Sequence, residues 1–266
     1  SSTVEDNNHT SQPRGCQAAI IVLFTPSVFL SVVAIALSGT IVAALDPTLA
    51  FRLSSSCQHN CTTQAKNLTY PSWINGHPAP FNLNQAEVAF FFTYSSVTYV
   101  LLSIPIGWMV DKYQNNSKVF KLIQAIGFVI LALCFALLGP LRLPIFLGGS
   151  QLSYKIENGL NNMACVAISL VLKGIGSATN NAAYPDMMIG IDEKDDILNA
   201  TMSGIWNAAY SIGWAFGPFV GGALYDVMKF DGFATVICGV SLFYSIVLTI
   251  AITCCKDRRS GVVSSW

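Results

Sequence analysis

Charged side chains are scarce in this sequence. Asp, Glu, Lys and Arg make up 11% of its 266 residues, whereas hydrophobic residues make up 53%. A typical soluble domain carries about 25% charged residues, so this chain has too few of them to cover a water-exposed surface. The 14 basic and 14 acidic residues balance to a net charge of zero. A chain without a basic excess is not expected to bind nucleic acid.

The motifs of catalysis and metal binding are missing as well. The sequence has no metal-ligand spacing, no nucleophile motif and no phosphate-binding loop. Its three histidines, His9, His59 and His77, are scattered through polar stretches and do not suggest a site. We therefore expect a protein that is not an enzyme and that holds no metal and no cofactor.

Long apolar runs are present instead. They are close to about 20 residues each, the length that crosses a hydrocarbon core of ~30 Å. Lipid offers the backbone no water to bond with, so each run must be a helix. The sequence therefore predicts an all-α, polytopic membrane protein with six transmembrane helices. The predicted helices cover approximately residues 18–45, 88–110, 119–139, 163–184, 201–225 and 233–254.

The polar segments divide the chain into parts. Residues 1–17 form a linker, residues 18–255 the six-helix bundle, and residues 256–266 a tail. Inside the bundle, a long loop covers residues 46–87 and a short polar loop covers residues 107–121. Because the chain begins within a linker, we expect it to be the C-terminal part of a longer protein.

The six predicted helices fall into two groups of three. The loop of residues 140–162 separates the first three from the last three. Two three-helix repeats of inverted orientation build one half of many transporters. The pattern therefore favours a pair of inverted repeats.

The distribution of lysine and arginine orients the bundle. With the linker in the cytoplasm, eight basic residues fall on the cytoplasmic side and five on the opposite side. Both termini of the chain are then cytoplasmic. Loop 46–87 lies outside and carries two glycosylation sequons, at Asn60 and Asn67. In that oxidising compartment Cys57 and Cys61 can form a disulfide or remain two free thiols.

The short polar loop contains a cluster that suits a conformational latch. Gly107 permits a neighbouring helix to approach closely. Asp111 can bond the free N–H groups of a helix N-terminus. Lys112 and Lys118 can pair with acidic side chains or anionic headgroups. The alternative is a plain solvated loop.

This loop, GWMVDKYQNNSK, resembles the motif G-x-L-a-D-r-x-G-r-k of the major facilitator superfamily. It departs from the motif at Gln114, where a second glycine is expected, and its basic residues resume only at Lys118. In the family this motif joins the second and third helices of each six-helix half on the cytoplasmic side. The resemblance implies the C-terminal half of a twelve-helix transporter. Its partners would be the N-terminal half, membrane lipid and a small organic solute.

A second motif lies in the predicted fifth helix, as GIWNAAYSIGWAFGPFVGG. Small residues four apart let two helices approach closely in lipid, and a proline bends a helix by removing a backbone hydrogen bond. The motif resembles one found in proton antiporters and amine transporters of the same superfamily. Helix packing without a transport role is the alternative. The residues that form it are Gly213, Gly217, Pro218, Gly221 and Gly222.

Three further stretches, AALDPTL, LLGPLRLP and LVLKGIG, resemble the vesicular amine and polyamine transporters of solute carrier family 18. The resemblance implies proton-coupled antiport of an organic cation or polyamine by alternating access, in a vesicular or other endomembrane or in the plasma membrane. The alternatives are a transporter of an organic anion or other small solute, and a non-transporting receptor or scaffold.

Two ionisable residues are candidates for the substrate and proton pathway. Lys173 lies about ten residues into the fourth apolar run, near the membrane midplane, where a charge costs ~3 kcal/mol. We expect it to have a functional or ion-paired role, against a side chain that snorkels to the interface. Asp46, just beyond the first run, can bind an amine or carry a proton. Lys173 alone would repel a cation, so it suits an organic anion or an exchangeable ion pair.

Neutral polar and aromatic residues complete the predicted pathway. Asn180, Asn181 and Asn207 stand in the fourth and fifth runs. The resemblance implies aspartates at about the places of Asn180 and Asn207 in monoamine transporters, so asparagines there disfavour monoamine chemistry. They can equally bridge helices. Aromatic rings can enclose an ammonium group, although rings at helical spacing also serve packing. The aromatic candidates are Tyr94, Tyr99, Trp206, Tyr210 and Trp214.

Overall fold

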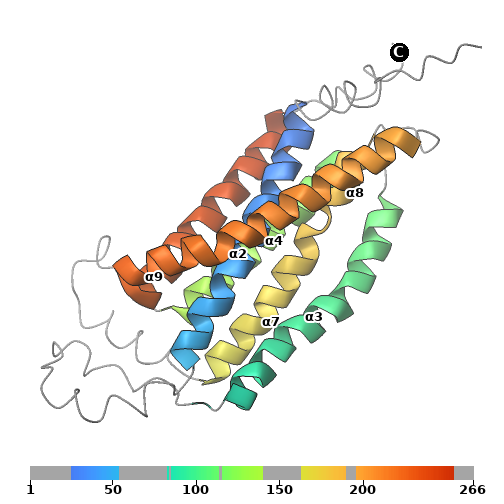
Figure 1. Ribbon diagram of the computed structural model, residues 1–266. Helices are drawn as coiled ribbons and strands as arrows, with labels where there is room; N and C mark the ends of the chain where they lie inside the picture. The colour runs from blue at the N-terminus through green and yellow to red at the C-terminus, as the bar shows by residue number, and fades with distance from the viewer. Residues whose placement is uncertain are drawn as a thin grey trace, which may run out of the picture.

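The computed structural model describes residues 25–53, 83, 85–113, 116–139, 163–189 and 196–254. Within these ranges the regular elements are helices that lie side by side in one bundle (Figure 1). They are α2 (Pro26–Leu53), α3 (Gln85–Lys112), α4 (Ser117–Leu138), α7 (Met163–Asn180), the short α8 (Ala183–Met188) and α9 (Asp196–Cys254).

Helix α9 doubles back and forms two arms. A straight helix of its 59 residues would be roughly 90 Å long, but its contacts follow α2 in one direction and then return. Figure 1 shows the two arms, in orange and red, meeting near the α9 label. We call residues 196–229 the first arm and residues 230–254 the second arm. The contacts, in order along α9, join Met202 to the cluster around Val28, Gly217 to Ala43, Phe230 to Arg52, and Tyr244 to Leu30.

The prediction of six membrane-spanning helices is confirmed in part. Five stretches of the described chain are long and apolar enough to cross a membrane: Pro26–Ala50, Gln85–Lys112, Ser117–Leu138, Met163–Met188 and Phe230–Thr253. The predicted fifth span, residues 201–225, is helical and runs along α2 but is not among these five. The fold is an all-helical membrane fold, and the pair of inverted repeats stays a prediction.

Helix α4 is central to the packing, whereas α3 is peripheral. The rings of Phe128 and Phe135 on α4 are fully buried and meet Tyr244 and Phe233 of the second arm edge-on. Helix α3 packs mainly against α7 and leaves most of its side chains exposed. Helix α3 contacts α7 closely at Gly174, where a Cβ would come within 2.6 Å of a backbone oxygen of α3. Only glycine permits that approach.

The glycines of the second motif lie against α2. A Cβ at Gly217 or Gly221 would come within 3 Å of the α2 backbone, and Gly213 faces α2 in the same way. Gly222 instead faces open space, and Pro218 lies inside the continuous helix. Three small residues at intervals of four therefore form the contact face between the first arm and α2.

Helix α2 corrects one prediction, because it continues past the expected end at residue 45 to Leu53. Leu45, Leu49 and Leu53 repeat every four residues and are all fully buried, so the apolar face extends through this stretch. Asp46 therefore lies inside the helix and not in the loop after it. Several predicted features lie outside the described residues: the linker 1–17, Cys57, Cys61, the sequons at Asn60 and Asn67, and the tail 256–266.

Candidate functional site

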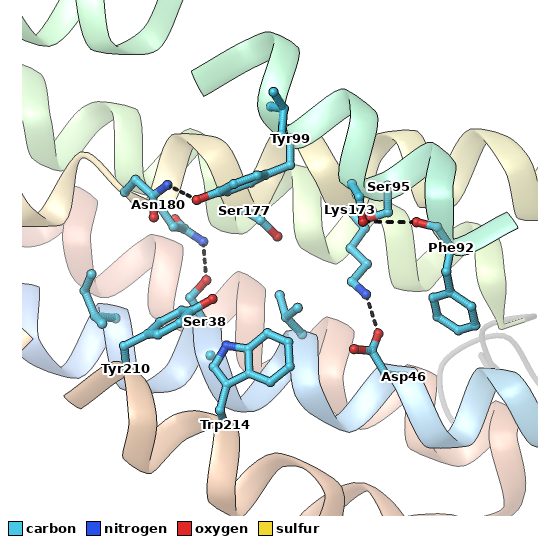
Figure 2. A pocket seen from close by; sticks show the side chains of 16 residues that line it. Ser38, Asp46, Phe92, Ser95, Tyr99, Lys173, Ser177, Asn180, Tyr210 and Trp214 are labelled. Carbon is cyan, nitrogen blue, oxygen red and sulfur yellow. Dashed lines mark hydrogen bonds and ion pairs between the residues drawn. The ribbon is translucent and has the colours of Figure 1, made fainter. Parts of the chain in front are cut away.

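A cavity of about 500 Å³ lies between α2, α3, α7 and the first arm of α9. Figure 2 shows an ion pair at one end of it and neutral polar groups at the other. Four helices from distant parts of the sequence are needed to enclose it. The structure brings five of the six predicted pathway residues to its wall: Asp46, Lys173, Asn180, Asn181 and Tyr210.

The sixth predicted residue, Asn207, is not part of the cavity wall. Its amide donates a hydrogen bond to the Ser203 carbonyl one turn earlier in α9, and its side chain is exposed. Intrahelical bonding of this kind satisfies the amide locally. Asn207 is therefore not placed with the other pathway residues in this conformation.

Lys173 and Asp46 form an ion pair across the cavity wall. The Lys173 Nζ lies 2.5 Å from the Asp46 Oδ1 and 5.6 Å from the centre of the Phe92 ring. The lysine side chain is only 7% exposed, whereas the aspartate side chain is 37% exposed. Pairing offsets the cost of holding the ammonium group at membrane depth. The carboxylate remains open to the cavity and to whatever enters it.

The opposite end of the cavity is polar but uncharged. The Asn180 amide donates to the Ser38 hydroxyl at 3.0 Å, and the Asn181 amide donates to the Tyr99 hydroxyl at 2.7 Å. Both asparagines therefore bridge helices as well as line the cavity. Their positions are compatible with both predicted roles, which are lining the pathway and bridging helices.

Three of the five aromatic candidates line the cavity, namely Tyr99, Tyr210 and Trp214. The other two lie elsewhere: Tyr94 packs its ring against Phe90 and Phe91, and Trp206 lies between Tyr184 and Tyr210. Rings from α3 and from the first arm thus face the same space. A complete cage of five rings is not formed.

The predicted latch residues make few contacts within the described chain. A Cβ at Gly107 would meet nothing within 4 Å, so no described helix approaches it closely. Asp111 and Lys118 are exposed, and the Lys112 Nζ lies 5.3 Å from the centre of the Trp108 ring. A latch formed by these four residues stays a prediction.

A second ion pair, formed by two residues that are not among the predicted site residues, lies buried near the end of the bundle where α2 begins. The Lys121 Nζ lies 2.8 Å from the Asp186 Oδ2, and the two side chains are 3% and 0% exposed. The hydroxyls of Ser31 and Ser117 donate to the same carboxylate at 2.5 and 2.6 Å. The pair ties α2, α4 and α8 together. Apolar neighbours around Asp186, such as Met187, were the available signal that this aspartate stays inside the bundle.

Comparison with known proteins identifies the family. The model of the Major Facilitator Superfamily matches residues 61–261, which is more than half of the chain. The chain belongs to the major facilitator superfamily. The predicted latch loop, the glycine motif and the helices α3, α4, α7, α8 and α9 lie within that match, whereas α2 lies before it.

Proteins named "MFS-type transporter SLC18B1" are among the relatives of this chain. The rat protein is 28% identical over 178 residues, which cover 62% of this chain and 35% of the relative. The human protein is 28% identical over 162 residues, which cover 59% of this chain and 32% of the relative. The chain thus spans about a third of the length of these relatives. These relatives support a place in the SLC18 group and a transporter function. No solved structure gives a significant match.

Proposed function

We propose that this chain is the C-terminal six-helix half of a twelve-helix transporter that exchanges protons for an organic cation by alternating access. The observation that carries the proposal is the Asp46–Lys173 ion pair, because its carboxylate is open to the cavity. An ammonium group that enters the cavity meets a carboxylate that, in the described chain, is held by one cationic side chain. It can displace that side chain and take its place.

Competition for one carboxylate would couple the two fluxes. Ionised Asp46 can hold Lys173 or an ammonium group, whereas protonated Asp46 is neutral and holds neither strongly. Proton binding therefore favours release of the cation, and cation binding favours release of the proton. The rings of Tyr99, Tyr210 and Trp214 offer faces that attract an ammonium group in the same cavity. We favour a polyamine as the solute, on the resemblance to the SLC18 group.

The alternative solute is an organic anion or another small molecule bound through Lys173. The exposures of the two partners favour the cation, because Lys173 is buried behind Phe92 while Asp46 is open. A receptor or scaffold without transport is less well supported. Such a protein has no need for an exchangeable ion pair in a solute-sized cavity.

The apolar side chains exposed on α3 and the first arm are suited to contact with other apolar surfaces. We propose that they contact lipid and the N-terminal half of the same protein, which would close the cavity from its open side. The proposal places both termini of the chain in the cytoplasm and the protein in a vesicular, other endomembrane or plasma membrane. The large exposed side chains include Phe90, Leu101 and Ile104 on α3 and Phe216 and Phe219 on the first arm.

The test uses full-length protein in proteoliposomes with an imposed proton gradient and labelled spermidine as the probe. We expect gradient-dependent uptake that Asp46→Asn lowers at least tenfold, because the neutral side chain cannot hold an ammonium group. Asp196→Asn is the control, since this exposed aspartate lies outside the cavity.

A different result would overturn the cation proposal. Absence of spermidine uptake, together with uptake of labelled succinate that Lys173→Ala removes, would assign the cavity to anions. Absence of transport of either probe, with the protein correctly folded, would favour the non-transporting alternative.

A further inference from the structure

Buried polar side chains lie between the levels of the two ion pairs in the interior of the bundle. The Asp46–Lys173 pair lies at the cavity, and the Lys121–Asp186 pair lies near the end where α2 begins. Between them, polar residues come from three helices at successive levels. We call these residues the buried polar path: Ser177 and Asn180 on α7, Ser38 on α2, and Gln124 on α4.

The packing of α4 on α7 and α8 fixes the level of each residue. Helix α4 runs antiparallel to the segment formed by α7 and α8, as three contacts in order along α4 establish. Gln124 therefore lies between the level of Asn180 and the level of Asp186. These levels are roughly 9 Å apart at 1.5 Å per residue, so Gln124 is near the midpoint. The three contacts are Lys121 with Asp186, Gly127 with Asn180, and Leu131 with Gly176.

The polar atoms along this path lack partners in the described chain. Gln124 is fully buried, and neither its Nε2 nor its Oε1 makes a hydrogen bond there. The same holds for the Asn180 Oδ1 and the Ser177 Oγ. A buried polar group without a hydrogen bond destabilises the folded protein. Three such side chains in a row between two ion pairs therefore call for a bound polar ligand.

Water fits this need better than a solute does. A buried water makes about three hydrogen bonds to otherwise unsatisfied polar groups, and Gln124, Asn180 and Ser177 offer both donors and acceptors. The cavity reaches Ser177 and Asn180 but does not include Gln124. The part of the path beyond Asn180 therefore lies outside the space that a solute would occupy.

We infer that the buried polar path binds a file of water molecules that carries protons between the cavity and the Lys121–Asp186 pair. The inference rests on the proposed proton-coupled function. A proton leaves Asp46, which becomes a carboxylate again, and each water passes one proton on as it receives one. The amides and hydroxyls keep their protonation states and only orient the waters. At the far end the Lys121–Asp186 pair takes up one proton from the file as it passes one on toward Ser27 and solvent, and the two side chains stay paired.

Polar groups continue past Asp186 toward the start of α2. The Lys121 Nζ also contacts the Ser27 hydroxyl at 2.5 Å, and Ser27 is only half-buried at the start of α2. The polar groups therefore extend to the end of the bundle. Gln124 is a positioning residue at the step between Asn180 and Asp186, where the path has no other polar residue.

The experiment compares two activities of the full-length protein in proteoliposomes, with labelled spermidine as the probe. One is uptake driven by a proton gradient, and the other is exchange of labelled for unlabelled spermidine without a gradient. We expect Gln124→Leu to lower driven uptake at least tenfold and to leave exchange within about twofold, because exchange needs no net proton movement. Gln124→Asn keeps a polar amide and should retain most of the driven uptake.

The control is Ser245→Ala, which removes a buried hydroxyl that bonds the neighbouring Ala125 carbonyl of α4 outside the path. Equal loss of both activities in Gln124→Leu would mean a structural contact only, and unchanged driven uptake would mean that protons take another route. Either result overturns the inference. Ser177→Ala offers a milder change should Gln124→Leu fail to fold, with an expected threefold loss of driven uptake alone. Failure of the proposed function differs from all of these, because the unaltered protein itself would show no driven uptake, and the inference would fall with it.

Discussion

The two ion pairs use the same chemistry in opposite ways. At Asp46–Lys173 the carboxylate is 37% exposed, and its one bonded partner among the described residues is the Lys173 ammonium group. At Lys121–Asp186 both side chains are nearly fully buried, and two serine hydroxyls donate to the carboxylate as well. An open pair with one bond can exchange partners, whereas an enclosed pair with several bonds is fixed. The first is therefore suited to binding, and the second to holding three helices together.

The largest expected effect comes from removing the buried carboxylate. Asp186→Ala would leave the Lys121 ammonium group buried without its counter-ion, and breaking such a pair costs about 3–5 kcal/mol. We expect a loss of that size in the free energy of unfolding, measured by denaturant titration of the purified protein in detergent. The exposed Asp196→Ala is the matched control and should cost less than about 1 kcal/mol. Equal costs for the two variants would show that the buried pair does not stabilise the bundle.

A smaller effect is expected from one of the serines that surround the buried pair. The Ser31 hydroxyl donates to the Asp186 Oδ2 from α2, and a hydrogen bond to a charged group contributes about 1.5–3 kcal/mol. Ser31→Ala should lower the free energy of unfolding by an amount in that range. Ser241→Ala removes an equally buried hydroxyl that bonds only its own helix, so it should cost less. If Ser241→Ala costs as much, the serines contribute no special support to the pair.

The membrane fold followed from the sequence because lipid leaves the backbone few choices. The position of each apolar run predicted a helix, and the helices that the structure describes lie on those runs. The end of the first run could not be predicted, since Asp46 and Pro47 resemble a helix stop. Burial of Leu49 and Leu53 against other helices carries α2 onward, and that tertiary contact is invisible in a single sequence.

The candidate site was predictable only where the charge of a single residue is costly to place inside a membrane. Lys173 stands out because an ammonium group at membrane depth needs a partner. The identity of that partner, Asp46, depends on how α2 packs beside α7, and no local pattern contains this information. Lys121 and Asp186 were harder still, because each lies next to a polar loop where charge is expected. Their burial is decided by the packing of α4 against α8.

The smallest expected effect concerns the aromatic ring beside the open pair. The Lys173 Nζ lies 5.6 Å from the centre of the Phe92 ring, a contact that contributes about 0.5–1 kcal/mol. Phe92→Leu should loosen Lys173, so a cationic solute would displace it more easily. We expect the KM for labelled spermidine to fall by roughly two- to fivefold. Phe91→Leu is the control, because that ring packs on Tyr94 and not on Lys173. A KM that rises in Phe92→Leu would mean that the ring contacts the solute itself. The exposure of Asp46 would then not be enough to explain how the solute binds.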